Sequence, residues 1–166
     1  MKRLLVIAVV VAVMAMAPTL AHADAAVVQD SCVYFQEGGQ DFVRIYFTVV
    51  NFSLPTGVCD LHLIAEPQPP DPGCVMLSVG APVGWSGITN VFGGADWYAN
   101  TPGDCIAPGT AKGNFWCVLD PSFCCYIAQF TDATGAVILE QEECFTDCKP
   151  LGVEEHSWGE VKRLYR

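Results

Sequence analysis

The chain is poor in positive charge. Its 166 residues include 18 Asp and Glu but only 8 Lys and Arg, which gives a formal net charge of −10 at pH 7. Proteins that bind nucleic acid or anionic lipid use clustered cations to displace counterions from the phosphates. We therefore expect neither nucleic acid nor an anionic membrane surface to be a partner.

The chain also lacks the spacings of common metal and catalytic sites. It has nine cysteines but no C-x-x-C pair and only three histidines, which argues against a zinc site. Residues 84–88 (GWSGI) lack the final glycine of the G-x-S-x-G hydrolase motif. A triad or Cys–His pair needs a positioned imidazole, and His62 is the one histidine inside the expected domain. We therefore predict no catalytic residues and no enzyme.

The first 23 residues have the pattern of a secretory signal peptide. Lys2 and Arg3 precede an apolar run over residues 4–17, and Ala21-His22-Ala23 supplies the small residues needed for cleavage before Asp24. A membrane anchor is the alternative, but the run is shorter than the roughly 20 residues that span a bilayer, and no second span follows. We predict a bacterial exported protein with no transmembrane span after cleavage.

All nine cysteines follow the predicted cleavage site. A high cysteine content behind a signal peptide is typical of proteins that fold in an oxidising compartment, where disulfides persist. The expected location is therefore extracellular or at the cell surface, with the periplasm as the alternative.

Short apolar stretches separated by turn residues predict an all-β fold. In the clearest strand, residues 42–50, Val43, Ile45, Phe47 and Val49 alternate with more polar residues, so one face should enter a core. Further strands are expected at 59–64, 74–79, 85–88, 96–98, 112–119, 124–131 and 136–145, with 24–31 as a short leader and the proline-rich residues 66–73 as an exposed loop. Since nothing between 24 and 148 shows helical periodicity, we predict an antiparallel β-sandwich.

The last hairpin allows one disulfide to be derived. If residues 133–135 form a three-residue loop that ends in a left-handed glycine, Asp132 faces Ala136. The same register places Cys124 opposite Cys144, within disulfide distance. A loop that differs by one residue would break this pairing.

The remaining cysteines allow weaker inferences. Neighbouring residues of a strand point to opposite faces, so Cys124 and Cys125 should bond to different partners. The odd cysteine should either stay buried and reduced or join two chains. Two further disulfides are hypotheses: Cys32–Cys148 near the two ends of the domain, and Cys59–Cys74 across the proline-rich loop.

A succession of short motifs resembles a known class of proteins. It consists of Pro82-x-Gly84-Trp85, then Trp97, then Ile106-Ala107-Pro108-Gly109, and then Phe115. The succession is similar to one found in exported bacterial modules of the immunoglobulin-like β-sandwich type, most of them uncharacterised. The resemblance spans roughly residues 42–145 and implies a fold but no activity.

The C-terminal tail has a pattern of its own. Residues 153–166 (VEEHSWGEVKRLYR) resemble tails of the form W-G-x-[I/V]-K-x-L-[Y/F] on otherwise different exported bacterial proteins. Ser157-x-x-Glu160 forms a capping box, which predicts a short helix. Its apolar residues recur at helical spacing and are the expected recognition residues: Trp158, Val161, Leu164 and Tyr165.

So short a helix is marginal in water by itself. We therefore expect it to order against the domain or against a sorting or anchoring receptor. The predicted organisation is a signal peptide (1–23), a β-sandwich (24–148), and a linker with the helical tail (149–166).

Two groups of residues are candidate ligand sites. Asp96 and Asp104 lie in a Gly- and Asn-rich stretch and could supply the oxygen ligands that calcium prefers. Trp85, Trp97 and Tyr98 could form a platform for a sugar ring, although burial in a sandwich core is the alternative. No other cofactor is predicted.

Our leading hypothesis is a non-enzymatic structural or binding module, secreted or at the cell surface, with a C-terminal recognition tail. The alternatives are a small secreted hydrolase that uses carboxylates and a carbohydrate-binding module. Two converging acids in a cleft near Trp85 or Trp97 would favour the hydrolase. Exposed, coplanar tryptophans would favour the carbohydrate-binding module.

Overall fold

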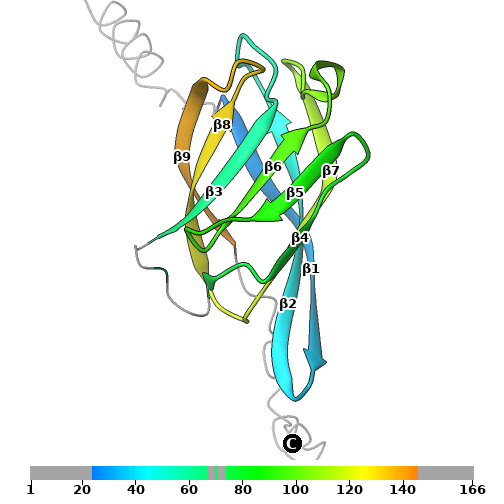
Figure 1. Cartoon of the computed structure of the whole chain (residues 1–166), viewed down its shortest axis with the longest axis vertical. Helices are drawn as coiled ribbons and strands as arrows, with labels where there is room; N and C mark the ends of the chain where they lie inside the picture. Colours follow the sequence, from blue (N-terminus) through cyan, green and yellow to red (C-terminus); the bar gives the residue numbers. More distant parts are fainter. Residues whose placement is uncertain (1–23, 67–69, 71–73, 146–166) are drawn as a thin grey trace, which may run out of the picture.

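The computed structural model describes residues 24–66, 70 and 74–145, which form two antiparallel β-sheets (Figure 1). The predicted signal peptide and tail helix lie outside the described residues. One sheet has the strand order β1-β2-β7-β4 and the other the order β5-β6-β3-β8-β9. The strands are β1 (Ala25–Glu37), β2 (Gln40–Asn51), β3 (Asp60–Glu66), β4 (Ser78–Gly80), β5 (Trp85–Thr89), β6 (Ala95–Ala99), β7 (Thr110–Leu119), β8 (Cys124–Thr131) and β9 (Val137–Phe145).

The alternation predicted for residues 42–50 is confirmed. Val43, Ile45, Phe47 and Val49 of β2 are all fully buried. The ring of Phe47 touches both sheets: its centroid lies 5.5 Å from that of Phe115 in β7 and 5.3 Å from that of Trp97 in β6. Such aromatic pairs contribute about 0.5–1.5 kcal/mol beyond the burial of apolar area. The sandwich core is therefore centred on aromatic packing between the sheets.

The prediction of a short leader at residues 24–31 is wrong, because β1 begins at Ala25. Ala25 and Val27 are buried in the core, and β1 pairs with β2 along its whole length. A register shift between Gln29 and Ser31 marks a β-bulge. Small and polar residues are poor strand formers by themselves, so pairing with β2 overrides their local preference.

The strand predicted at 74–79 is shorter than expected, because β4 includes only Ser78–Gly80. The residues before it serve a connection: the amide of Met76 donates to the carbonyl of Gly93, 2.8 Å away, instead of to a sheet neighbour. Met76 and Cys74 are nevertheless buried, which explains their strand-like apolar pattern.

The three-residue loop of the last hairpin is confirmed, but the disulfide derived from it is wrong. The amide of Asp132 donates to the carbonyl of Ala136 at 3.0 Å. Thr131 then pairs with Val137, yet the preceding Phe130 pairs with Leu139, so one extra residue bulges from β9. This shift places Cys125, not Cys124, opposite Cys144, and these two cysteines form the disulfide.

Three disulfides join described residues: Cys59–Cys105, Cys74–Cys124 and Cys125–Cys144. The predicted Cys59–Cys74 pair is therefore wrong, because Cys59 bonds to Cys105 and Cys74 bonds to Cys124 of β8. The prediction that Cys124 and Cys125 bond to different partners is confirmed. Cys32 is disulfide-bonded as well, but Cys148, its predicted partner, lies outside the described residues.

The cysteine left over is Cys117 in β7, which is a buried free thiol. Burial raises its pKa to about 12, because a thiolate in the core would lose its hydration. Reactivity follows the thiolate form, so this thiol is inert in the folded protein.

The disulfides indicate an oxidising compartment. Among the described residues, no helix has the length and apolar composition needed to cross a membrane.

Candidate functional site

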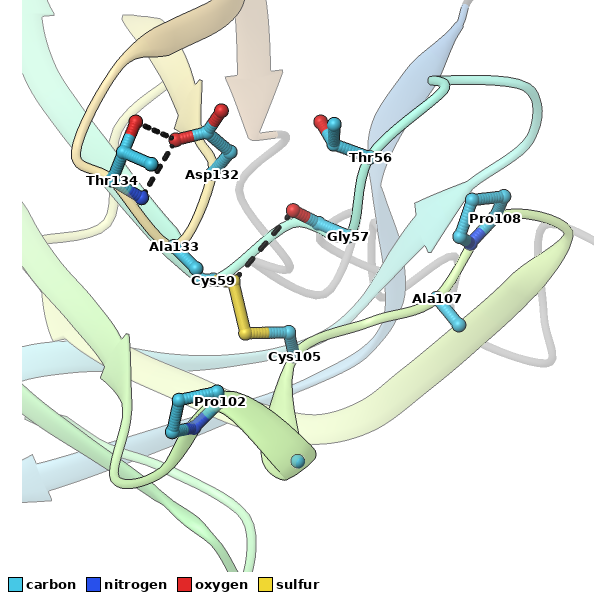
Figure 2. A pocket seen from close by; sticks show the side chains of 11 residues that line it. Thr56, Gly57, Cys59, Pro102, Cys105, Ala107, Pro108, Asp132, Ala133 and Thr134 are labelled. Carbon is cyan, nitrogen blue, oxygen red and sulfur yellow. Dashed lines mark hydrogen bonds between the residues drawn. A yellow bond between two sulfur atoms is a disulfide. The ribbon is translucent and has the colours of Figure 1, made fainter.

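A well-formed pocket lies at one end of the sandwich, between three connections (Figure 2). It has a volume of about 470 Å³, and we call it the loop-end pocket. Its walls come from the β2–β3 connection, the β6–β7 connection and the β8–β9 turn. The lining residues are Thr56, Gly57, Cys59, Pro102, Gly103, Cys105, Ala107, Pro108, Asp132, Ala133 and Thr134.

A disulfide fixes two of these walls. Cys59 and Cys105 are joined inside the pocket, with their Cα atoms 4.4 Å apart (Figure 2). Next to the disulfide, Val58 and Ile106 form a β-bridge in which each amide donates to the other's carbonyl. A Cβ at Gly57 would lie 3.2 Å from the Cβ of Cys105, so a glycine allows this close approach. The pocket is therefore preformed.

A buried side chain holds the β2–β3 connection in place. Asn51, fully buried, donates from Nδ2 to the carbonyls of Thr56 and Ile106 at 3.0 and 3.1 Å. Its Oδ1 accepts from the amide of Leu54 at 3.0 Å. Because a buried amide left without partners costs about 1–3 kcal/mol, these bonds specify one loop conformation.

The third wall depends on Asp132. Its Oδ1 accepts from the amide of Thr134 at 2.8 Å, from the Thr134 hydroxyl at 2.6 Å and from the amide of Ala136 at 3.3 Å. These hydrogen bonds to the charged form lower the pKa of Asp132. The turn closes through Gly135 at φ +78°, a conformation that glycine adopts without strain.

A smaller hollow of about 150 Å³ adjoins the loop-end pocket and shares Cys59, Cys105 and Asp132 with it. It adds Asp60, whose Oδ2 accepts from the Thr131 hydroxyl at 2.8 Å. Two carboxylates thus border the site, and none of the residues that line either hollow is Lys or Arg. The electrostatics favour neutral or positively charged ligands over anions.

The acid–base properties of Asp132 do not suit it to act as a general acid. A carboxyl that acts as a general acid near neutral pH needs a raised pKa, whereas the pKa of Asp132 is lowered. Most of the remaining lining is proline, alanine and glycine, which offer apolar contact and shape.

The predicted aromatic platform is wrong, because Trp85 and Trp97 belong to the core. The indole N–H of Trp85 donates to the backbone carbonyl of Asp104 at 2.9 Å, and that of Trp97 donates to Gly80 at 3.0 Å. Tyr98 is 45% exposed, since it points away from the core on the same strand as Trp97. Strand alternation separates the three rings, so they cannot stack together on one ligand.

The predicted calcium residues have different partners. The Oδ1 of Asp96 lies 3.1 Å from Nδ1 of His62 and accepts from Asn90 at 2.9 Å. The Oδ2 of Asp104 accepts from the Thr101 hydroxyl at 2.7 Å. The structure does not join the two carboxylates in one hydrogen-bonded cluster.

Among the described residues, one group has metal-binding atoms close together: Cys125, Glu142 and Cys144. Both cysteines are already bonded to each other. A disulfide sulfur is not the thiolate that binds metals, so this group is no metal site.

Sequence reasoning missed the loop-end pocket, because its lining has few chemically distinctive side chains. The signals that did exist are the Ile106-Ala107-Pro108-Gly109 turn, the turn at residues 132–135 and the cysteines at 59 and 105. A predicted Cys59–Cys105 disulfide would have placed the turn at residues 106–109 next to the β2–β3 connection.

No family model matches this chain, and neither does any curated protein or solved structure compared with it.

Proposed function

We propose that the chain is an exported, non-enzymatic binding module that holds an apolar group of a partner in the loop-end pocket. The observation that carries this proposal is the pocket itself, which three connections wall and a disulfide braces. Preformed, mostly apolar hollows are the usual ligand sites of proteins. Binding loops on a rigid β scaffold are a common way to build them.

We further propose that the scaffold is an immunoglobulin-like sandwich. In such domains, one sheet has the order A-B-E-D and the other contains C, F and G. The orders β1-β2-β7-β4 and β3-β8-β9 match these sheets in sequence, and the β5–β6 hairpin is then an addition beside β3. The match of strand order supports the resemblance carried by the P-x-G-W and I-x-P-G motifs.

The preferred ligand group is apolar and neutral or positively charged. Asp132 stays ionised at the rim because its pKa is lowered, and Asp60 borders the adjoining hollow. A carboxylate or phosphate would face both acids with no cation of the lining to offset them. An aromatic or aliphatic amine gains both apolar contact and charge attraction.

A pair of alanines allows this proposal to be tested. Ala133 lines the loop-end pocket, whereas Ala136, in the same turn, does not. Methyl NMR of residues 24–166 would follow Ala107 and Thr134 during titration with benzylamine, benzyl alcohol and benzoate. We expect saturable shifts with benzylamine and benzyl alcohol, weaker shifts with benzoate, loss of binding in Ala133→Trp and retention in Ala136→Trp. Absence of saturable shifts with both benzylamine and benzyl alcohol would refute the proposal.

We also propose export through the N-terminal signal and recognition through the C-terminal tail. The disulfides support the first part, and the spacing of Trp158, Val161, Leu164 and Tyr165 supports the second. Deletion of residues 150–166 should change localisation or partner capture while the far-UV spectrum and unfolding midpoint of the domain stay the same. Unchanged localisation and capture would contradict the recognition role.

A further inference from the structure

Arg44 lies on the outer face of the four-stranded sheet, between two aromatic rings. Its guanidinium carbon is 4.9 Å from the ring centroid of Trp116 in β7 and 5.6 Å from that of Phe35 in β1. The Trp116 ring in turn covers Gly80 of β4, where any Cβ would collide with the indole. The four strands thus hold the guanidinium in a fixed orientation through stacking.

The hydrogen bonding of Arg44 is incomplete. Its Nε is buried, and no described residue accepts a hydrogen bond from it. No salt bridge of Arg44 with a described carboxylate is found either. A buried donor without an acceptor costs about 1–3 kcal/mol, and more when the group is charged. The Arg44 guanidinium therefore lacks a described acidic partner, although the chain contains 18 Asp and Glu residues.

A second pocket opens beside this guanidinium. It has a volume of about 200 Å³, and we call it the Arg44 pocket. Its apolar walls are Phe35, Phe42, Leu77 and Val118, and Leu77 is 51% exposed. Glu37 and Ser78 complete the lining. Two of its lining residues, Glu37 and Phe42, flank the β1–β2 turn. This hairpin projects from the end of the sandwich opposite the β8–β9 turn (Figure 1).

We propose that the Arg44 pocket binds an organic monocarboxylate that carries one aromatic ring or a short aliphatic chain. The carboxylate accepts hydrogen bonds from the part of the guanidinium that lines the pocket. The apolar part of the ligand packs against Leu77 and the two phenylalanines. A planar carboxylate fits the two-pronged guanidinium edge, and burial of the apolar part adds about 25 cal/mol per Å² removed from water.

Two observations favour a monocarboxylate over phosphate or another polyvalent anion. Glu37 lines the same pocket, and its negative charge repels a second anion in proportion to that anion's charge. The whole chain carries a net charge of −10, which disfavours polyanions further. The apolar walls would also leave most of a phosphate group without partners.

The Nε–H signal of Arg44 in a ¹H–¹⁵N spectrum provides a direct readout. The other arginines of residues 24–166 are Arg163 and Arg166, so the spectrum has few competing signals. The probes are 3-phenylpropionate, its amide and inorganic phosphate. We expect a saturable shift of the Arg44 signal with 3-phenylpropionate and none with the amide or phosphate.

Three variants establish the origin of the shift. Leu77→Trp fills the pocket from an exposed position and should abolish binding without unfolding the protein. Arg44→Lys keeps the positive charge but loses the paired N–H donors of the guanidinium. Affinity for 3-phenylpropionate should therefore fall at least about tenfold, as expected when a hydrogen bond to a charged group is lost. Lys112→Gln is the matched control, because it removes the other Lys or Arg of the described residues. Lys112 lies on β7, six positions before Val118, which pairs with Arg44. This variant should bind the probe like the original protein.

The outcomes separate cleanly. Loss of binding in Leu77→Trp with retention in Lys112→Gln supports the proposal. Equal binding of acid and amide would overturn the role of the carboxylate, and no saturable shift with either would overturn the site. Because the loop-end pocket is tested with benzylamine and benzyl alcohol, failure of one proposal leaves the other standing.

Discussion

The two sheets are held together in different ways. In the five-stranded sheet, Cys125–Cys144 joins β8 to β9, and the other two described disulfides tie β8 and the start of β3 to neighbouring connections. No disulfide joins two strands of the four-stranded sheet in the described part of the chain, although Cys32 of β1 is disulfide-bonded, and Cys117 at the sheet's centre is a free thiol. Among the described residues, a disulfide therefore joins two strands of the five-stranded sheet, whereas the strands of the four-stranded sheet are joined to one another by hydrogen bonding and packing.

Both sheets contain nearby and distant strand pairs, since β2 pairs with β7 in one and β3 pairs with β8 in the other. In the four-stranded sheet, β1 and β2 are joined by a turn at two glycines, so little chain entropy is lost when they pair. In the five-stranded sheet, β3 pairs with β6 and β8, which lie far along the chain. Disulfides that close long loops restrict the unfolded chain most. The described disulfides span 46, 50 and 19 positions, so their contributions to stability should differ.

The largest loss of stability is expected from a substitution in the core face of the four-stranded sheet. Phe47→Ala removes a fully buried ring that contacts Trp97, Phe115 and Phe145, and it should lower the free energy of unfolding by about 3–5 kcal/mol. Urea unfolding with the disulfides intact measures this loss. Tyr46→Ala, at the next position of β2 but outside the core, is the control and should cost clearly less. Equal costs would show that packing between the sheets is not what holds β2.

The stability lost on removal of a disulfide should increase with the length of the loop that the disulfide closes. Cys74–Cys124 spans 50 positions and Cys125–Cys144 spans 19. Replacing both cysteines by alanine should therefore cost about 4 kcal/mol for the first pair and about 3 kcal/mol for the second, on the chain-entropy model. Urea midpoints of the two double variants test the order. A larger loss for the Cys125–Cys144 pair would mean that the disulfides act mainly through local contacts.

The smallest change in stability is expected in the β8–β9 turn, which lines the loop-end pocket. The pKa of Asp132 is lowered from 3.8, first by the Thr134 hydroxyl and then by backbone amides. A group whose pKa is lower in the folded state stabilises the protein above its ordinary pKa, and this contribution is lost as the pH falls below 3.8 toward the folded-state value. Asp132→Asn should thus be slightly less stable than the original protein at pH 7.

The same pair of proteins should become equal in strongly acidic solution. Urea midpoints measured between pH 7 and pH 2 would show the difference shrinking as the carboxyl takes up its proton. Asp24→Asn, at a group that bonds to the Ser53 hydroxyl outside both pockets, corrects for the change in net charge. A difference between Asp132→Asn and the original protein that does not change with pH would rule out the charged hydrogen bonds as its cause.

Much of the sheet structure could be predicted from local patterns. The alternation in β2 and the bounds of β8 depend on runs of β-branched and aromatic residues, which report directly on a half-buried strand. The hairpin loop followed from Gly135, because few residues other than glycine tolerate a positive φ. These features depend on residues that are close together in sequence.

The errors arise where one strand or connection meets another. The start of β1 is a strand because β2 lies beside it, and the short Ala25–Asp30 stretch carries little strand preference of its own. The bulge in β9 changes the cysteine pairing by one residue and has no glycine to mark it. The two pockets likewise arise where separate connections or strands meet, and no single segment contains either of them.

The most direct test of the account is disulfide mapping of the exported protein without reduction. Electron-transfer fragmentation, which cleaves between Cys124 and Cys125, assigns these neighbouring residues separately. We predict Cys59–Cys105, Cys74–Cys124 and Cys125–Cys144, together with a Cys117 thiol that iodoacetamide modifies only after unfolding. A Cys124–Cys144 bridge, or a Cys117 that reacts in the folded protein, would contradict the register and the core described above.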